Sequence, residues 1–155
     1  MIDISKAWLG AVPWESVLTL NQTLCQAQKA QYATNAKSFA SVGVRWQNAV
    51  ARTSCLVEAL DLIRECREAL PFTLNNGNTF AAIAKTLVDD WVASLSPIEA
   101  QIVRATVCHY VAGQVGRKEL LQVLQHLGPA CKHPAPASVK SEPAPVGQVQ
   151  AQGAV

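Results

Sequence analysis

The sequence has little charge. Asp, Glu, Lys and Arg make up 15% of its 155 residues, against about 25% in a typical soluble domain. The thirteen basic and eleven acidic residues leave a formal net charge of +2, which is too small to indicate a nucleic-acid-binding surface. In contrast, half of the residues are hydrophobic, so a chain of this length can build one domain with a core of its own.

The sequence also lacks the segments that direct a chain into or across a membrane. Asp3 stands where a signal peptide carries only positive charge, and no apolar stretch follows it. The most apolar region, residues 80–95, is interrupted by Lys85, Asp89 and Asp90, whereas a membrane-spanning helix needs about 18 apolar residues or more. We therefore expect no transmembrane segment and a cytoplasmic location.

The cysteines do not form a recognisable framework. There are five of them, an odd number, and none has the C-x-x-C spacing of metal or redox motifs. This pattern predicts reduced, buried thiols that pack as small hydrophobic groups. The five are Cys25, Cys55, Cys66, Cys108 and Cys131.

No enzyme motif is present. The sequence has no phosphate-binding loop, no dinucleotide glycine pattern and no nucleophile in a glycine-rich elbow. Cys108, His109, His126, Cys131 and His133 match no common zinc module in their spacing. We predict a non-enzymatic protein with no catalytic residue, cofactor or metal.

Apolar periodicity in the first half predicts two long antiparallel helices, over residues 13–42 and 44–70. Pro13 suits a first helical turn, Gly43 predicts a kink or a break between the helices, and Pro71 ends the second. An amphipathic stripe along the first helix is the candidate surface-binding or partner-binding site. It comprises Trp14, Leu18, Cys25, Tyr32, Phe39 and Trp46. Alternatively, this stripe packs against Leu56, Leu60 and Ile63 of the second helix.

Three shorter helices are predicted over residues 79–94, 97–115 and 117–127. Residues 75–78 form a loop signal before the first of them, and Ser96 with Glu99 forms a capping box at the start of the second. Proline and alanine dominate residues 129–155, so this tail is predicted to be disordered. The expected fold is therefore an all-α domain over residues 1–128 with a flexible tail.

Two helices joined at Gly113 and Gly116 also suggest a helix-turn-helix over residues 97–127. A recognition helix presents several basic or amide side chains to DNA. Here Arg117 and Lys118 are the only cations of the second helix, and leucines follow them. We therefore expect no nucleic-acid partner.

Residues 14–70 resemble the phasins, small helical proteins that coat bacterial polyhydroxyalkanoate granules. The resemblance lies in the start at residues 18–22, the Ala-, Gln- and Asn-rich stretch at 24–40, the alanines of 49–51 and the acidic-leucine block at 58–62. It implies a granule-associated coat or scaffold protein, and the uncharged Gln- and Asn-rich face of the first helix separately predicts a homo-oligomer that associates through residues 14–39. Its amphipathic helices would lie on the hydrophobic polymer.

The sequence therefore supports two non-catalytic functions. One is the phasin-like granule coat, and the other is a soluble helical-bundle adaptor that binds a protein partner. Trp8, Trp14 and Trp46 distinguish them, because the coat requires them at the surface and the adaptor places them in the core or in a partner pocket.

Overall fold

The structure is a computed structural model that describes residues 5–127. The described chain is all-helical and contains no strand, which confirms the predicted fold class. It has six helices: α1 (Trp14–Ala27), α2 (Phe39–Val50), α3 (Leu56–Glu68), α4 (Asn76–Val92), α5 (Pro97–Val111) and α6 (Arg117–Leu127). None of these helices is long and apolar enough to cross a bilayer. The predicted disordered tail lies outside the described residues.

The predicted helix over residues 13–42 is wrong. Helix α1 ends at Ala27, and Lys29 adopts a positive φ of 54°. The chain from there to α2 is held by the connection between α3 and α4, where the Asn35 N–H donates to the Pro71 carbonyl at 2.8 Å. The Ala33 carbonyl also accepts from the Thr73 N–H at 3.0 Å. These long-range bonds replace the helical ones that the apolar periodicity suggested.

The second predicted long helix, over residues 44–70, is wrong as well. Helix α2 ends at Val50 and α3 begins at Leu56. Between them, Ser54 exchanges two backbone hydrogen bonds with Lys6, at 3.0 and 3.1 Å. Gly43 neither kinks nor breaks the chain but lies buried inside α2. A Cβ there would stand 2.8 Å from Trp14 Nε1, so the missing side chain lets α1 and α2 approach closely.

The shorter helices follow the predictions more closely, and α6 has the predicted bounds. The capping box is confirmed, since Ser96 Oγ accepts from the Glu99 N–H at 3.3 Å and Glu99 accepts from the Ser96 N–H at 3.0 Å. Helix α5 ends four residues earlier than predicted because Gly113, with φ of 80°, turns the chain after Val111.

Helix α4 begins three residues earlier than predicted and ends two residues earlier. Asn75 takes the left-handed conformation that the asparagine-rich loop provides, with φ of 62°. Asn76 is already helical, and its side chain bonds both the N–H and the carbonyl of Phe72, at 3.0 and 2.7 Å. These bonds close the turn before the helix.

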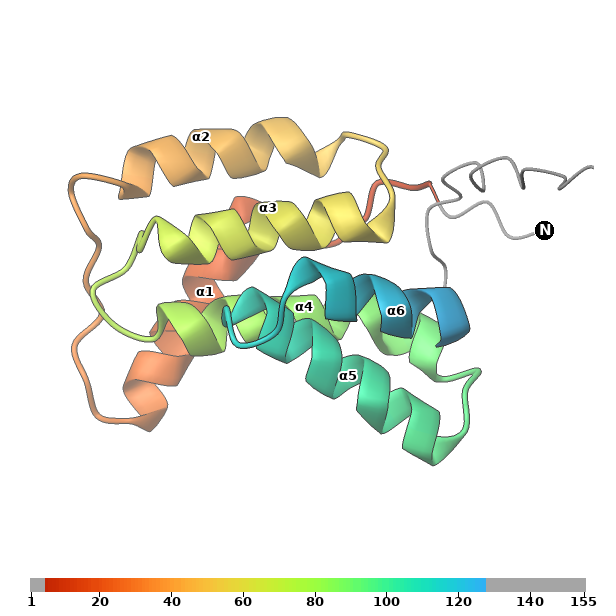
Figure 1. Ribbon diagram of the computed structural model, residues 1–155. Helices are drawn as coiled ribbons and strands as arrows, with labels where there is room; N and C mark the ends of the chain where they lie inside the picture. Colours follow the sequence, from red (N-terminus) through yellow and green to blue (C-terminus); the bar gives the residue numbers. More distant parts are fainter. Residues whose placement is uncertain (1–4, 128–155) are drawn as a thin grey trace, which may run out of the picture.

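Helix α4 is the centre of the bundle. It packs against α1, α3 and α5, while α6 packs on α5. Helix α2 lies at the outer edge, where it packs on α1 and runs beside α3 (Figure 1). Completely buried side chains such as Leu60, Ile63, Phe80 and Leu120 fill the space between the helices, and this apolar burial stabilises the fold.

An aromatic cluster joins α1 and α2 to α4. Ring centroids of Trp14 lie 5.8 Å from Phe39, 6.1 Å from Trp46 and 6.1 Å from Phe72. The Trp46 indole is completely buried and donates to the Val12 carbonyl at 2.8 Å. The cluster thus satisfies its polar atom while it packs the two N-terminal helices onto the core.

Cys25, Cys66 and Cys108 are free thiols, as expected. Burial raises the pKa of Cys66 to about 12 and also raises that of Cys108. Cys55 differs because it is disulfide-bonded, so the prediction of reduced thiols is wrong for this residue. Cys131 lies outside the described residues.

Candidate functional site

The residues of the predicted amphipathic stripe are buried or partly buried, and they lie on α1, on the α1–α2 connection and on α2. Trp14, Cys25 and Trp46 expose 6%, 1% and 0% of their area, and Leu18, Tyr32 and Phe39 are partly buried against the same core. The two tryptophans and Phe39 meet in the aromatic cluster, where Tyr32 joins them through Phe72 at 6.1 Å. The packing alternative is therefore supported, although α1 packs on α4 and α2 rather than on α3.

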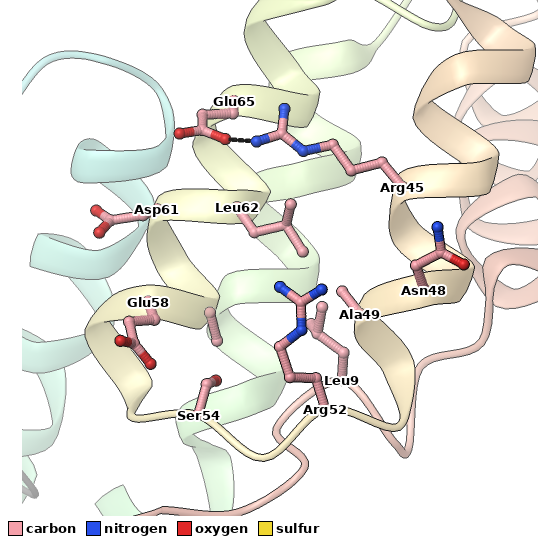
Figure 2. A pocket seen from close by; sticks show the side chains of 11 residues that line it. Leu9, Arg45, Asn48, Ala49, Arg52, Ser54, Glu58, Asp61, Leu62 and Glu65 are labelled. Atoms are coloured by element: carbon pink, nitrogen blue, oxygen red, sulfur yellow. Dashed lines mark hydrogen bonds and ion pairs between the residues drawn. The ribbon is translucent and has the colours of Figure 1, made fainter.

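A groove with a volume of about 500 Å³ lies between α2 and α3. Figure 2 shows this α2–α3 groove from close by. It is lined by Leu9, Arg45, Asn48, Ala49, Arg52, Ser54, Glu58, Ala59, Asp61, Leu62 and Glu65. Its size is within the usual range for ligand-binding pockets.

The two walls of the groove carry opposite charges. The α2 wall carries Arg45, from α2 itself, and Arg52, from the turn that follows it, whereas α3 contributes Glu58 and Glu65. Arg45 reaches across to Glu65 and forms an ion pair that spans the groove (Figure 2). Both of these side chains remain about half exposed, at 54% and 49%. This pair therefore closes one end of the groove only weakly.

At the opposite end of the groove, no ion pair among the described residues joins the two walls. Glu58 accepts a hydrogen bond from the Cys55 N–H at 3.2 Å, and Arg52 has no ion-pair partner within residues 5–127. Figure 2 shows the Arg52 guanidinium extended from the end of α2 toward α3. At this end the groove therefore presents the Arg52 cation, while Glu58 lines the wall and points away from α2 in Figure 2.

The floor of the groove is apolar. Leu9, Ala49 and Ala59 are buried, with 3%, 8% and 4% of their area exposed. Leu62 is half-buried and points into the space between the two helices (Figure 2). Because the alanine side chains on both helices are short, they leave space between the charged side chains. The bottom of this space is an apolar strip.

On the other side of α3, charged and polar groups pair with one another. The Tyr110 hydroxyl donates to Asp61, and Arg117 donates to the same carboxylate through Nε and Nη2 at 3.3 Å each. Arg64 lies over the Tyr110 ring with its guanidinium carbon 4.8 Å from the centroid. We call Asp61, Arg64, Tyr110 and Arg117 the Asp61 network. A hollow of about 410 Å³ lies over it.

The Asp61 network changes the acidity of its tyrosine. Burial is the largest cause, and the hydrogen bond to Asp61 and the charge of that carboxylate act in the same direction. Together they raise the pKa of Tyr110 to about 12, against the opposing effect of Arg64 and Arg117. The Tyr110 hydroxyl therefore keeps its proton and donates a hydrogen bond to Asp61, and this bond joins α5 to α3.

Sequence reasoning missed the groove. The acidic side of α3 is visible in the sequence as Glu58, Asp61, Glu65 and Glu68, but the same pattern is typical of any solvated helix face. Arg45 and Arg52 have the same seven-residue spacing, which is the available signal. It becomes a site only when the turn at residues 51–55 brings α3 beside α2.

The groove offers charged, amide, hydroxyl and apolar groups for binding a ligand. Within residues 5–127, no group of three or more His, Cys, Asp or Glu side chains is placed to hold a metal ion. Comparisons of the chain with protein-family models, curated proteins and solved structures found no match.

Proposed function

We propose that this protein is a non-enzymatic helical-bundle adaptor that binds a segment of a protein partner in the α2–α3 groove. The observation that carries the proposal is an apolar strip between two walls of opposite charge. Such an arrangement fits a peptide segment better than a small apolar ligand, because a peptide can place apolar and charged side chains on one face.

Charge complementarity defines the chemistry of the partner segment. An anionic side chain faces Arg52, a cationic side chain faces Glu58, and apolar side chains between them cover Ala49 and Leu62. The Arg45–Glu65 pair opens at little cost when the segment extends along the groove, because exposed ion pairs contribute only about 0–1 kcal/mol.

The tryptophans also support the adaptor over the granule coat. Trp8, Trp14 and Trp46 are buried, at 6%, 6% and 0% exposure, whereas the coat needs them at the surface. The most exposed large apolar side chains lie on separate elements: α2, the α3–α4 connection and α5. They are Val44, Leu70, Leu74, Ile98 and Ile102. No single helix among residues 5–127 offers a polymer surface a continuous apolar stripe.

The test places a photo-crosslinking amino acid at Leu62, in the groove, and at the exposed Gln22 on α1 as the matched control. We expect one protein to be crosslinked from position 62 and not from position 22. The partner segment is then purified and titrated against the wild-type chain.

Arg52→Glu should weaken this binding at least about tenfold, or about 1.4 kcal/mol. Lys118→Glu makes the same charge change on α6 and should leave the affinity unchanged. Equal losses in both variants would contradict the groove as the site. Saturable binding of the chain to polyester particles, with a blue shift of tryptophan emission, would favour the coat instead.

A further inference from the structure

We propose that the partner segment binds the α2–α3 groove as an amphipathic α-helix that carries two carboxylates seven residues apart. One carboxylate pairs with Arg52, and the other pairs with Arg45, from which it displaces Glu65. The helical form and the charge pattern rest on the adaptor function proposed above, because they describe the partner of that same groove.

The walls of the groove are the faces of two neighbouring helices. On α3, the lining side chains at positions 58, 61, 62 and 65 follow the i, i+3, i+4, i+7 spacing of one helix face. On α2, those at positions 45, 48 and 49 begin the same pattern. The two helices run side by side (Figure 1), and such a pair offers a seam into which a third helix packs.

The groove offers few backbone groups to an extended segment. Residues 5–127 contain no strand, so the groove has no sheet edge to which such a segment adds. In the turn after α2, both backbone groups of Ser54 are taken by Lys6, at 3.0 and 3.1 Å, and the Arg52 N–H donates to the Ala49 carbonyl at 3.0 Å. An extended segment would therefore lay most of its backbone groups unpaired on the apolar floor, whereas a helix satisfies its own.

The charges that face the groove favour an acidic partner. Of the acidic side chains that line it, Glu58 points away from α2, and Asp61 is engaged in the Asp61 network on the other side of α3 (Figure 2). Arg45, Arg52 and Glu65 remain on the side of the groove. Two cations and one carboxylate therefore meet the partner, and complementary charge on the partner is negative.

The two arginines define the spacing of the partner's carboxylates. Arg45 lies on α2, and Arg52 lies two residues beyond its end. Seven residues correspond to about 10 Å along a helix. A partner helix that lies along the groove presents its positions i and i+7 on one side at this same separation, and the positions between them cover Ala49 and Leu62.

Glu65 occupies Arg45 in the free protein. Their ion pair spans the groove (Figure 2), so a carboxylate of the partner binds Arg45 only after the Glu65 carboxylate has moved away. The side chain of Glu65 therefore lowers the affinity of the groove for an acidic helix. Because both side chains of the pair are about half exposed, the pair is weak and the effect is a few-fold.

The test uses two designed, fluorescently labelled peptides of about 18 residues, long enough to form a helix. Both have the same composition, with one stripe of leucines and two glutamates. The glutamates stand seven residues apart beside the stripe in the first peptide, and five residues apart on different faces in the second. We expect the first to bind at least about tenfold more tightly in fluorescence anisotropy, and to gain helicity on binding in circular dichroism.

Three results would overturn the helical partner. They are equal affinities of the two peptides, binding of the first without a gain in helicity, and no binding of either peptide.

Neutral variants of the protein test the roles of the charges with the first peptide. Arg52→Gln should weaken binding about tenfold, and Glu65→Gln should strengthen it about threefold, because Arg45 is then free to pair with the peptide. Lys118→Gln on α6 removes a charge outside the groove and should leave the affinity unchanged. Unchanged or weaker binding to Glu65→Gln, in a variant with the wild-type melting temperature, would overturn the competition.

These outcomes are separable from those of the adaptor proposal. If a protein is captured at position 62 but its crosslinked segment lacks the two carboxylates or is interrupted by proline, the adaptor function stands and the acidic helix is wrong. If the first peptide binds as expected but position 62 captures no protein, the groove binds an acidic helix and the adaptor function fails.

Discussion

The two sides of α3 use similar side chains in different ways. Toward α5 and α6, Asp61 accepts hydrogen bonds from Tyr110 and Arg117, and Arg64 both covers the Tyr110 ring and donates to the Val115 carbonyl at 3.3 Å. Toward α2, a single half-exposed ion pair spans an apolar groove. Charged groups that share several partly buried partners hold neighbouring helices in place. An isolated, exposed ion pair contributes little, so its two side chains can separate and bind other groups.

The largest effect is expected at the buried face of α3. We predict that this face, rather than either charged side of the helix, supplies most of the packing energy of α3. Leu60 is completely buried, so Leu60→Ala should lower the free energy of unfolding by about 2–5 kcal/mol. Leu62, two residues away at the groove, is half-buried, and the same truncation there should cost clearly less. Urea denaturation of both variants checks this difference, and equal losses would mean that the groove floor is as tightly packed as the core.

The second prediction concerns the packing of α2, which forms one wall of the groove, on α1. Gly43→Ala would place a Cβ 2.8 Å from Trp14 Nε1, so we expect a loss of about 1–3 kcal/mol from overpacking. Gly77 in the first turn of α4 has no neighbouring atom within 4 Å of the added Cβ, so Gly77→Ala should be neutral or stabilising by up to about 1 kcal/mol. If the two variants have the same melting temperature, close contact with Trp14 does not position α2.

The helices that were predicted well start at local sequence signals, whereas the helices that were predicted poorly depend on long-range contacts. The starts of α5 and α6 depend on nearby signals, namely the Ser96–Glu99 capping box and the glycines before Arg117. The first half fails because the seven-residue recurrence of apolar side chains crosses two non-helical connections. Backbone hydrogen bonds join Asn35 to Pro71 and Ser54 to Lys6 in these connections. The two residues of each pair are too far apart in the sequence for a local pattern to indicate the contact.

The candidate site was harder to predict than the core for the same reason. The apolar recurrence picked out Trp14, Phe39 and Trp46, and these side chains are buried or partly buried in the core, as hydrophobicity alone favours. The groove instead depends on where α2 lies relative to α3. That placement comes from the turn at residues 51–55, where Ser54 exchanges two backbone hydrogen bonds with Lys6, and no periodicity in the sequence encodes this long-range pairing.

The third prediction compares one hydrogen bond with one ion pair. Tyr110→Phe removes the hydroxyl that donates to Asp61 and should cost about 1–2 kcal/mol, because the acceptor is charged and partly buried. Arg45→Ala removes the exposed pair with Glu65 and should change stability by less than about 0.5 kcal/mol. Chemical denaturation of the two variants measures the difference, and a larger loss in Arg45→Ala would reverse the comparison of the two sides of α3.

The smallest effect is the pH dependence that the Asp61 network imposes on stability. The pKa of Tyr110 is raised to about 12 by burial and by its bond to Asp61, whereas a tyrosine in the unfolded chain ionises near pH 10. Below about pH 10 both states hold the proton, and the stabilisation is fully present. Between about pH 10 and 12 only the unfolded chain releases it, so stability falls as the pH rises.

The free energy of unfolding, measured by chemical denaturation across this range, should therefore fall less steeply with pH in Tyr110→Phe than in the wild-type chain. The remaining decline in that variant reports on Tyr32, whose pKa burial also raises, and on the other groups that titrate there. Identical slopes in the two proteins would show that the folded chain does not retain the Tyr110 proton, and the Asp61 network would then be no more closed to solvent than the groove.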